Sequence, residues 1–236
     1  MDPYAWSWNP EALVAVPALA LGYALAVRRY PAPRWRIACA AGAAVLLLAV
    51  TITPVETIAL NYLLSFHLVQ NVVVAEWAPL LAVLAIPPAL AARVPRVPAV
   101  PALALWLVNY GVWHLPWIYD AALRNPHTLL HLEHLLYFVT GLLLWWPVVH
   151  GDLGSGAKAV YVFAAFVLAS PIGLMLALVP EPIYAFYEEA PRLWGVSPLL
   201  DQQIAGVLMS VTEAIVFFAV FAVYLVRFFR EQDAAD

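Results

Sequence analysis

The chain has 236 residues, of which 65% are hydrophobic and 11% are charged, with a mean hydropathy of +0.85 and a formal net charge of −4. A soluble domain carries about a quarter charged residues, so this composition excludes an ordinary soluble protein and indicates an integral membrane protein. A single cysteine, Cys39, excludes an intrachain disulfide, and no basic patch or glycine-rich loop points to nucleic acid or nucleotides.

Seven apolar segments follow one another, each close to the ~20 residues that a helix needs to cross a bilayer. We expect them at about residues 11–27, 35–52, 57–90, 98–115, 127–150, 157–179 and 200–229. Pro79 and the Pro87–Pro88 pair should break the long third segment, because proline cannot donate a backbone hydrogen bond. Trp117–Arg124 is predicted as a short helix at the membrane surface. The expected fold is all-α, a single domain of seven transmembrane helices over residues 1–236.

Basic residues predict the orientation of these segments. If the N-terminus lies outside, nine of the 11 Lys and Arg residues fall on one side of the membrane, and only Arg124 and Arg192 fall on the other. An excess of Lys and Arg marks the cytoplasmic side. We therefore expect the N-terminus outside and the C-terminus in the cytoplasm. Met1–Pro10 lacks the basic start and the cleavage site of a signal peptide, so we expect no cleavable leader.

The fifth segment opens with His127, His131 and His134, whose spacing of four and three places them on one helix face. Ionisable side chains inside a span are costly to bury and mark a functional site. With the N-terminus outside, His131 and His134 lie about 6 and 10 Å below the outer surface. His67 of the third segment should lie about 15 Å below it, close to mid-membrane.

Further candidate ligands fall in the same half of the membrane. His114 is near the outer end of the fourth segment, and Met209 of the seventh is at a depth similar to that of His67. Imidazole and thioether ligands suit copper, particularly Cu(I). The pattern predicts a copper site drawn from His67, His114, His131, His134 and Met209. Alternatively, each of these histidines simply hydrogen-bonds a neighbouring helix, an interaction worth about 1 kcal/mol. We expect His127 to be a solvated residue at the membrane surface and His150 to lie in a cytoplasmic loop.

Three carboxylates, Glu76, Glu133 and Glu213, lie inside predicted spans, where each must be protonated, paired or open to a polar cavity. Glu133 is next to His134 and is a candidate for ordering an imidazole. The three glutamates are also candidates for a proton relay. Asp201 opens the last segment, where capping of that helix and metal ligation explain it equally well.

Four motifs occur in order along the chain: FHLVQN (Phe66–Asn71), WHLPWIYDAAL (Trp113–Leu123), HLEHLLYFVTGLLLWWPVV (His131–Val149) and DQQIAGVLM (Asp201–Met209). Together they resemble the CtaG-type cytochrome c oxidase assembly factors, seven-span membrane proteins of bacteria and archaea. The resemblance implies an assembly chaperone of respiratory-chain biogenesis in the plasma membrane of a prokaryote, and not a catalyst. It also implies copper supply, with a haem–copper oxidase subunit or another copper chaperone as the partner.

The family's histidines carry over onto His67, His114, His131 and His134, with Asp201 and Met209 from the last motif. One part of the family pattern is absent. The family usually has methionine directly after the first histidine and a second histidine four residues on, where this chain has Leu68 and Asn71. Asparagine is a poor copper ligand, so the site is expected to bind copper more weakly, to use another residue such as Glu76, or to have lost copper. Asn71 is grouped with Glu76, Glu133, Asp201 and Glu213 as a residue that supports the metal ligands or relays protons.

Other interpretations use the same residues. A membrane metalloenzyme, a haem protein or a di-metal centre would also need intramembrane imidazoles, although no Glu-x-x-His pair occurs in the spans. A proton- or ion-conducting bundle would use the three glutamates. A scaffold for the oxidase would need no metal. The sequence defines neither the oligomeric state nor the metal stoichiometry.

Overall fold

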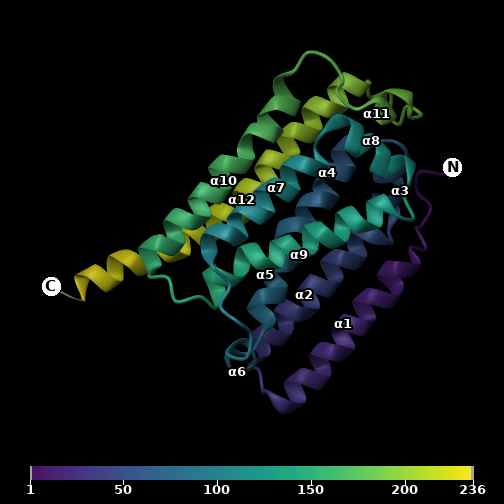
Figure 1. Cartoon of the computed structure of the whole chain (residues 1–236). Helices are drawn as coiled ribbons and strands as arrows, with labels where there is room; N and C mark the ends of the chain where they lie inside the picture. Colours follow the sequence, from purple (N-terminus) through teal and green to yellow (C-terminus); the bar gives the residue numbers. More distant parts are fainter. Residues whose placement is uncertain (1, 235–236) are drawn as a thin grey trace.

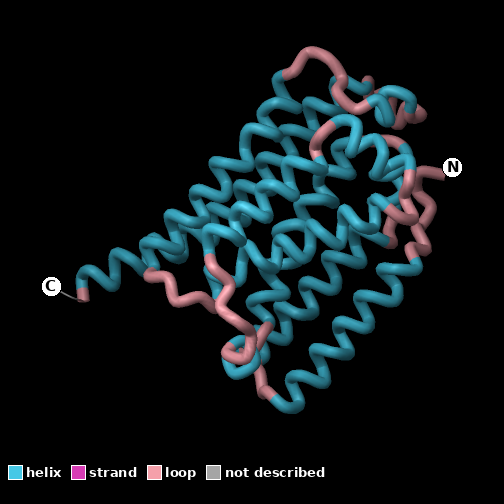
Figure 2. The backbone as a smooth tube through the Cα atoms, viewed as in Figure 1, coloured by secondary structure: helices cyan, strands magenta, loops and turns pink. Residues whose placement is uncertain are grey.

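The structure is a computed structural model that describes residues 2–234, and over this range it is helical without any strand (Figures 1 and 2). The all-α prediction is therefore confirmed. The elements are α1 (Pro10–Arg29), α2 (Arg34–Thr51), α3 (Pro54–Asn61), α4 (Leu64–Val72), the π-helix η1 (Val73–Trp77), α5 (Ala78–Ala85), α6 (Pro88–Ala91), α7 (Ala99–Trp113), α8 (Pro116–Arg124), α9 (Leu129–Val149), α10 (Ser155–Leu178), α11 (Ala185–Glu189) and α12 (Pro198–Asp233).

Among the described residues, six helical stretches are long and apolar enough to cross a membrane, so the chain is a multi-pass membrane protein. They are α1, α2, the continuous stretch from α4 to α5, α9, α10 and α12. Helix α7 is apolar but has only 15 residues, so the seventh crossing stays a prediction. The two chain ends lie at opposite ends of the bundle (Figure 1), as an odd number of crossings requires.

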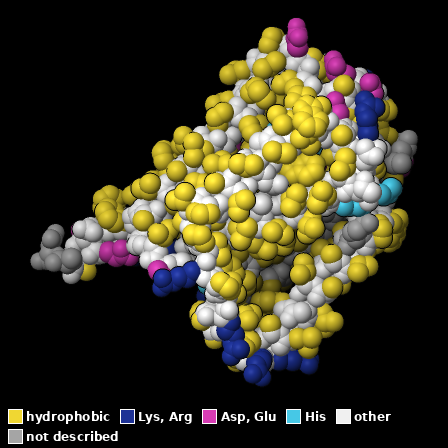
Figure 3. Space-filling view, in the orientation of Figure 1, with side chains coloured by type: hydrophobic (Ala, Val, Ile, Leu, Met, Phe, Trp, Pro, Cys, Tyr) yellow, Lys and Arg dark blue, Asp and Glu magenta, His cyan; other side chains and the backbone are white. Residues whose placement is uncertain are grey.

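Charged side chains gather at the two ends of the bundle (Figure 3). In this view Lys and Arg collect beside the α1–α2 connection and α6, whereas most Asp and Glu near the opposite end lie by α11. The sides between them are largely hydrophobic, as a surface that contacts lipid should be. The predicted orientation, with the N-terminus outside, stays a prediction; we call the α11 end the outer end below.

The third apolar segment forms the centre of the bundle. In an 18-residue window of the stretch from Leu64 to Ala85, 61% of the residues are buried, whereas 6% of residues 12–29 of α1 are buried. Helices α12, α2 and α9 pack against this central stretch, α10 packs along α12, and α7 packs on α9. Side chains carried by α4, η1 and α5 therefore face protein on several sides, and polar groups among them need partners within the bundle.

The central segment is interrupted only in part where its prolines predict. It ends after Ala85, just before Pro87–Pro88, as expected. Helix continues through Pro79, but the preceding turn widens into η1, because Pro79 has no N–H for the carbonyl of Ala75 four residues earlier. A break that we did not predict separates α3 from α4 at residues 62–63.

This break bears on the predicted depth of His67. The depth of about 15 Å assumed one continuous helix from Thr57. Since α4 begins at Leu64, His67 lies in the first turn of its own helix, and its depth in a membrane stays a prediction. The residue is thereby brought level with the outer ends of α7 and α9.

Two side chains hydrogen-bond to backbone carbonyl groups at the end of α5, where Pro87 and Pro88 have no N–H group to donate. Arg36 Nη1 donates to the carbonyl oxygens of Leu84 at 2.6 Å and Ile86 at 2.7 Å. His150 Nε2 lies 2.9 Å from the carbonyl oxygen of Val83. His150, which we expected to be a loop residue, thus contacts the backbone at the end of the central stretch, as Arg36 does.

Helix α9 packs closely against the π-helical turn. A Cβ atom at Gly141 would lie 2.1 Å from the carbonyl oxygen of Ala75 and 2.7 Å from Cγ of Pro79. One turn further along α9, Trp145 Nε1 donates to the carbonyl oxygen of Glu76 at 2.9 Å. The contact therefore requires glycine at position 141 and fixes the backbone of η1.

At the outer end, Glu56 of α3 joins the N-terminal segment to the centre of the bundle. Asn9 Nδ2 donates to Glu56 Oε1 at 3.3 Å, and Gln70 Nε2 of α4 donates to Glu56 Oε2. Burial raises the pKa of Glu56 to about 7, although these two hydrogen bonds oppose the shift.

We expect Gly141→Ala to lower the free energy of unfolding by about 1–3 kcal/mol, because its methyl group would force α9 away from η1. Gly111→Ala is the matched control, since no atom lies within 4 Å of a Cβ atom at that position. It should be neutral or stabilising by about 0.4–1 kcal/mol. Unfolding in detergent micelles measures both, and equal stability of the two variants would contradict the close packing at Gly141.

The raised pKa of Glu56 predicts a pH dependence of stability. The folded protein holds the Glu56 proton more tightly than the unfolded chain, whose pKa is about 4.3, so this contribution is full below about pH 4 and is lost as the pH rises through about 7. Glu56→Gln should remove that decline in the midpoint of thermal unfolding, while Glu188→Gln at an exposed position should retain it. A wild-type midpoint that stays constant between pH 4 and 7 would contradict this assignment.

Candidate functional site

Three of the predicted histidines meet at the outer end of the bundle, each from a different helix. His67 comes from the first turn of α4, His114 directly follows α7, and His134 lies in the second turn of α9. The rings of His67 and His134 are 6.2 Å apart, edge to face. The ring of Tyr119 lies between those of His67 and His114, at centroid distances of 5.3 Å from His67 and 6.2 Å from His114.

Two tyrosine hydroxyls fix the His67 ring. Its Nδ1 atom is 3.0 Å from the hydroxyl of Tyr187 and 3.1 Å from that of Tyr119. Tyr187 gives its own proton to the carbonyl oxygen of Ala59, at 2.6 Å, so we assign the proton of the imidazole to Nδ1, which donates to Tyr187. The Nε2 atom is then an unprotonated acceptor, and it is buried with no hydrogen-bond partner.

The same tautomer follows for His114. Its Nδ1 atom is 2.8 Å from the carbonyl oxygen of Tyr110, a group that can only accept, so Nδ1 carries the proton. Nε2 of His114 and Nε2 of His134 are also buried without a partner. A metal-binding imidazole is usually oriented in this way, with one nitrogen donating to a protein oxygen and the other left for the metal.

The arrangement suits two ligands on one metal ion better than three. Among residues 2–234, no group of three or more His, Cys, Asp or Glu side chains is arranged to hold a metal ion. The rings of His67 and His134, carried by different helices, lie 6.2 Å apart, so two imidazoles are near each other here. The donor set therefore fits a low-coordinate soft ion such as Cu(I).

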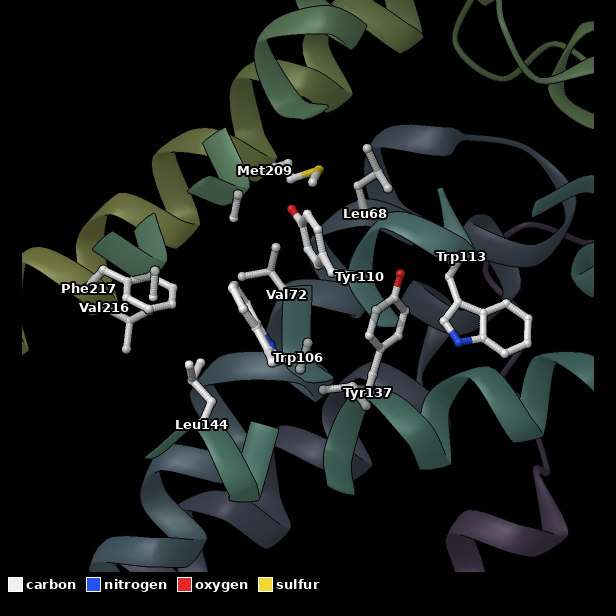
Figure 4. Packing of buried hydrophobic residues seen from close by; sticks show 14 of the residues in the cluster. Leu68, Val72, Trp106, Tyr110, Trp113, Tyr137, Leu144, Met209, Val216 and Phe217 are labelled. Carbon is white, nitrogen blue, oxygen red and sulfur yellow. The ribbon is translucent and has the colours of Figure 1, made fainter. Parts of the chain in front are cut away.

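Two other predicted ligands lie apart from this pair. His131 is half-buried nearer the outer rim, and its ring is 6.2 Å from that of His127. Met209 is buried in the apolar core cluster with Leu68 and Tyr110 (Figure 4). The one-face prediction for the histidines of α9 thus describes a row from rim to interior, although His127 precedes the helix.

The predicted supporting residues form two polar groups. Asn71 Nδ2 donates to Glu133 Oε1 at 3.1 Å, so the position where the family usually has a second histidine binds a carboxyl group instead. Glu76 and Glu213 lie together further along the bundle, where the Tyr110 hydroxyl donates to Glu213. All three carboxyl groups are buried.

Asp201 has a role that we did not predict. Its carboxylate accepts hydrogen bonds from the backbone N–H groups of Leu64, at 2.6 Å, and Ser65, at 3.1 Å. It therefore caps α4, whereas its own helix α12 is capped by Ser197. Because α4 begins inside the protein, its first N–H groups have no water to bind, and the carboxylate also favours the positive end of the helix.

The connection between α10 and α12, residues 179–197, covers the histidines. Gln202 accepts from the backbone N–H of Ile183 at 2.6 Å, and Asp120 accepts from those of Ala185 and Phe186 at 3.2 and 3.1 Å. The Tyr184 hydroxyl donates to the carbonyl oxygen of His114. This connection holds Tyr187 over His67.

Sequence reasoning did not single out Tyr119 and Tyr187. Tyr119 lies within the WHLPWIYDAAL motif, and Tyr187 lies in an aromatic stretch of a connection that we treated as a loop. The sequence feature that they share is a tyrosine outside the predicted apolar spans, followed by a residue with a carboxylate. Such a pattern is equally typical of an interfacial aromatic belt, so only the folded arrangement identifies their contact with His67.

Comparisons with known proteins gave one result. A family model described as cytochrome c oxidase caa3 assembly factor (Caa3_CtaG) matches residues 20–231. No curated protein and no protein of solved structure matches the chain.

We expect Asp201→Ala to lower the free energy of unfolding by about 1–2 kcal/mol, because the first N–H groups of α4 lose their cap. Amide exchange at Leu64 and Ser65 should accelerate more than exchange in α10. Asp233→Ala, an exposed change in the same helix, is the control and should alter neither quantity. Unchanged exchange at Leu64 in Asp201→Ala would contradict the capping role.

Proposed function

The chain belongs to the family of cytochrome c oxidase caa3 assembly factors, and we propose that it binds Cu(I) at the outer end of its bundle for delivery to a haem–copper oxidase. The observation that carries this proposal is the set of three buried Nε2 atoms, on His67, His114 and His134, that have no hydrogen-bond partner. Leaving a buried polar atom unpaired costs about 1–3 kcal/mol, so unpaired imidazole nitrogens gathered in one region favour a ligand that binds there.

The proposed site uses His67 and His134 as its ligands and His114 as the nearby third imidazole. The hydroxyls of Tyr187 and Tyr119 lie 3.0 and 3.1 Å from Nδ1 of His67 and orient its ring. His127 and His131 form the outer end of the row, on the side from which the ion enters. We assign Met209 to packing, given its place in the apolar core. The partner is an oxidase subunit or another copper chaperone, at the plasma membrane of a prokaryote.

A metal-free assembly role is the second candidate. It is favoured by the absence of a three-ligand group among the described residues and by the Asn71–Glu133 hydrogen bond at a position where the family usually has histidine. In that case the protein would support oxidase maturation by contact alone. Maturation of the oxidase in cells that carry His134→Ala distinguishes the two, because a scaffold would tolerate that change.

Copper binding is tested on the purified protein, loaded with Cu(I) without oxygen and titrated with a competing chelator. We expect His67→Ala and His134→Ala to lose binding, and Tyr187→Phe to bind about 10- to 100-fold more weakly because the ring of His67 is no longer oriented. His127→Ala at the exposed rim is the control, with affinity near that of the wild type. Wild-type protein that retains no more copper than His134→Ala would reject the copper role.

A further inference from the structure

The π-helical turn places Glu76 against α12, in the interior of the bundle. Its backbone is held from α9 by Trp145 and by the contact at Gly141, and the next residue, Trp77, donates from Nε1 to the carbonyl oxygen of Thr212 on α12 at 3.2 Å. π-Helical turns inside α-helices occur frequently at functional sites. Both neighbours of the turn thus fix Glu76 opposite the next residue of α12, Glu213.

The carboxyl groups of Glu76 and Glu213 are neighbours in a setting without water. Their side chains are 0% and 1% exposed. Apart from Glu213, neither oxygen of Glu76 has a polar partner, and Oε2 of Glu213 has no donor either. The hydroxyl of Tyr110 on α7 donates to Oε1 of Glu213. The pair therefore has one donor for four carboxyl oxygens.

Nothing in the surroundings neutralises two negative charges. Within residues 2–234 the ion pairs are Arg96–Asp152 and Arg124–Glu189, both at the ends of the bundle. The other titratable side chain that interacts with both glutamates is Tyr137 of α9, beyond which lies Glu133. Two ionised carboxylates in contact within an apolar interior repel each other and lose their hydration, so at least one must carry a proton.

Aromatic side chains pack near the Glu76–Glu213 pair. The ring of Trp106 stacks on Tyr110 with centroids 5.3 Å apart, and Phe217, one turn beyond Glu213, lies 5.8 Å from Trp106 (Figure 4). The two larger pockets lie elsewhere, one of about 910 Å³ by Arg96 and His150 and one of about 210 Å³ beneath α1. A metal cation would need more oxygen ligands than two carboxyl groups and a phenol supply.

We propose that Glu76, Glu213 and Tyr110 form a proton-binding site in the interior of the bundle, with the proton held between the two carboxyl groups. Tyr110 donates to Glu213 and so leaves the shared proton to lie on the Glu76 side of the pair. Tyr110 also contacts His114, whose Nδ1 donates to its backbone carbonyl oxygen, but the two carboxyl groups are not part of the proposed site at His67 and His134, and the ligand of this site is the proton and not copper. One shared proton reduces the charge of the pair from two negative charges to one, and the pair retains a group that can release a proton.

Infrared spectroscopy of the whole protein in lipid nanodiscs tests the proposal, because a protonated carboxyl group has a carbonyl stretch that a carboxylate lacks. At neutral pH, the difference between wild type and the double variant Glu76→Gln/Glu213→Gln should contain a carboxylic-acid carbonyl band that shifts in D₂O. Tyr110→Phe should keep this band but shift its frequency, since one hydrogen bond to Glu213 is lost. Glu188→Gln, at an exposed position, should remove carboxylate bands only.

Glutamine matches the size of a protonated glutamate, so the double variant should remain folded. The wild-type protein with ¹³C-labelled glutamate provides a test that needs no variant, in which a carboxylic-acid band of the labelled residues must persist at neutral pH. Loss of carboxylate bands alone in the double variant would overturn the proposal, and so would the absence of any acid band in the labelled wild type. Displacement of the band by Na⁺ or Mn²⁺ would overturn it too, because the site would then bind a metal cation.

Discussion

The hydrogen bonds from Leu64 and Ser65 to Asp201 are the interaction on which the rest of the outer end depends. A helix that begins inside a membrane protein exposes N–H groups that no water can reach, and each would be costly if left unpaired. A carboxylate from α12 satisfies two of them. This permits the central segment to break at residues 62–63 and start again at Leu64, which brings His67 level with His114 and His134. A contact between two segments that are more than 130 residues apart in the sequence thus sets the position of the candidate ligand His67.

The remaining polar residues of the site follow the same rule of internal satisfaction. Gln70 binds Glu56, Asn71 binds Glu133, and the His67 ring donates to Tyr187. Two sets of buried atoms are nevertheless unpaired, the Nε2 atoms of the three histidines and the two oxygens of the Glu76 carboxyl group, and Gln70, Asn71 and Glu133 each keep one unpaired side-chain oxygen as well. The first set lies at the outer end under the 179–197 connection, and the second lies deeper, at a turn with π-helical geometry.

Much of the fold followed from the sequence because apolar length and flanking charge are local properties. The boundaries of α2, α9, α10 and α12 agree with the predicted segments to within a few residues. The predicted cluster agrees with the structure in part, because His67, His114 and His134 lie near one another whereas His131 and Met209 lie apart from them. The break before Leu64 did not follow, because neither proline nor glycine marks it. The cap by Asp201 and the tyrosine contacts of His67 join residues far apart in sequence, and no local pattern encodes such a pairing.

The π-helical turn has a consequence for the spacing of the central helix. A π turn accommodates one residue more than an α turn, so everything beyond residue 77 is rotated by about 100° relative to an uninterrupted α-helix. Insertion or deletion of a single residue within Val73–Trp77 would therefore change which way Glu76 points, or would turn the whole of α5 against α2 and α9. The length of the segment Val73–Trp77, and not only the identity of its residues, therefore determines how α5 is oriented in the bundle.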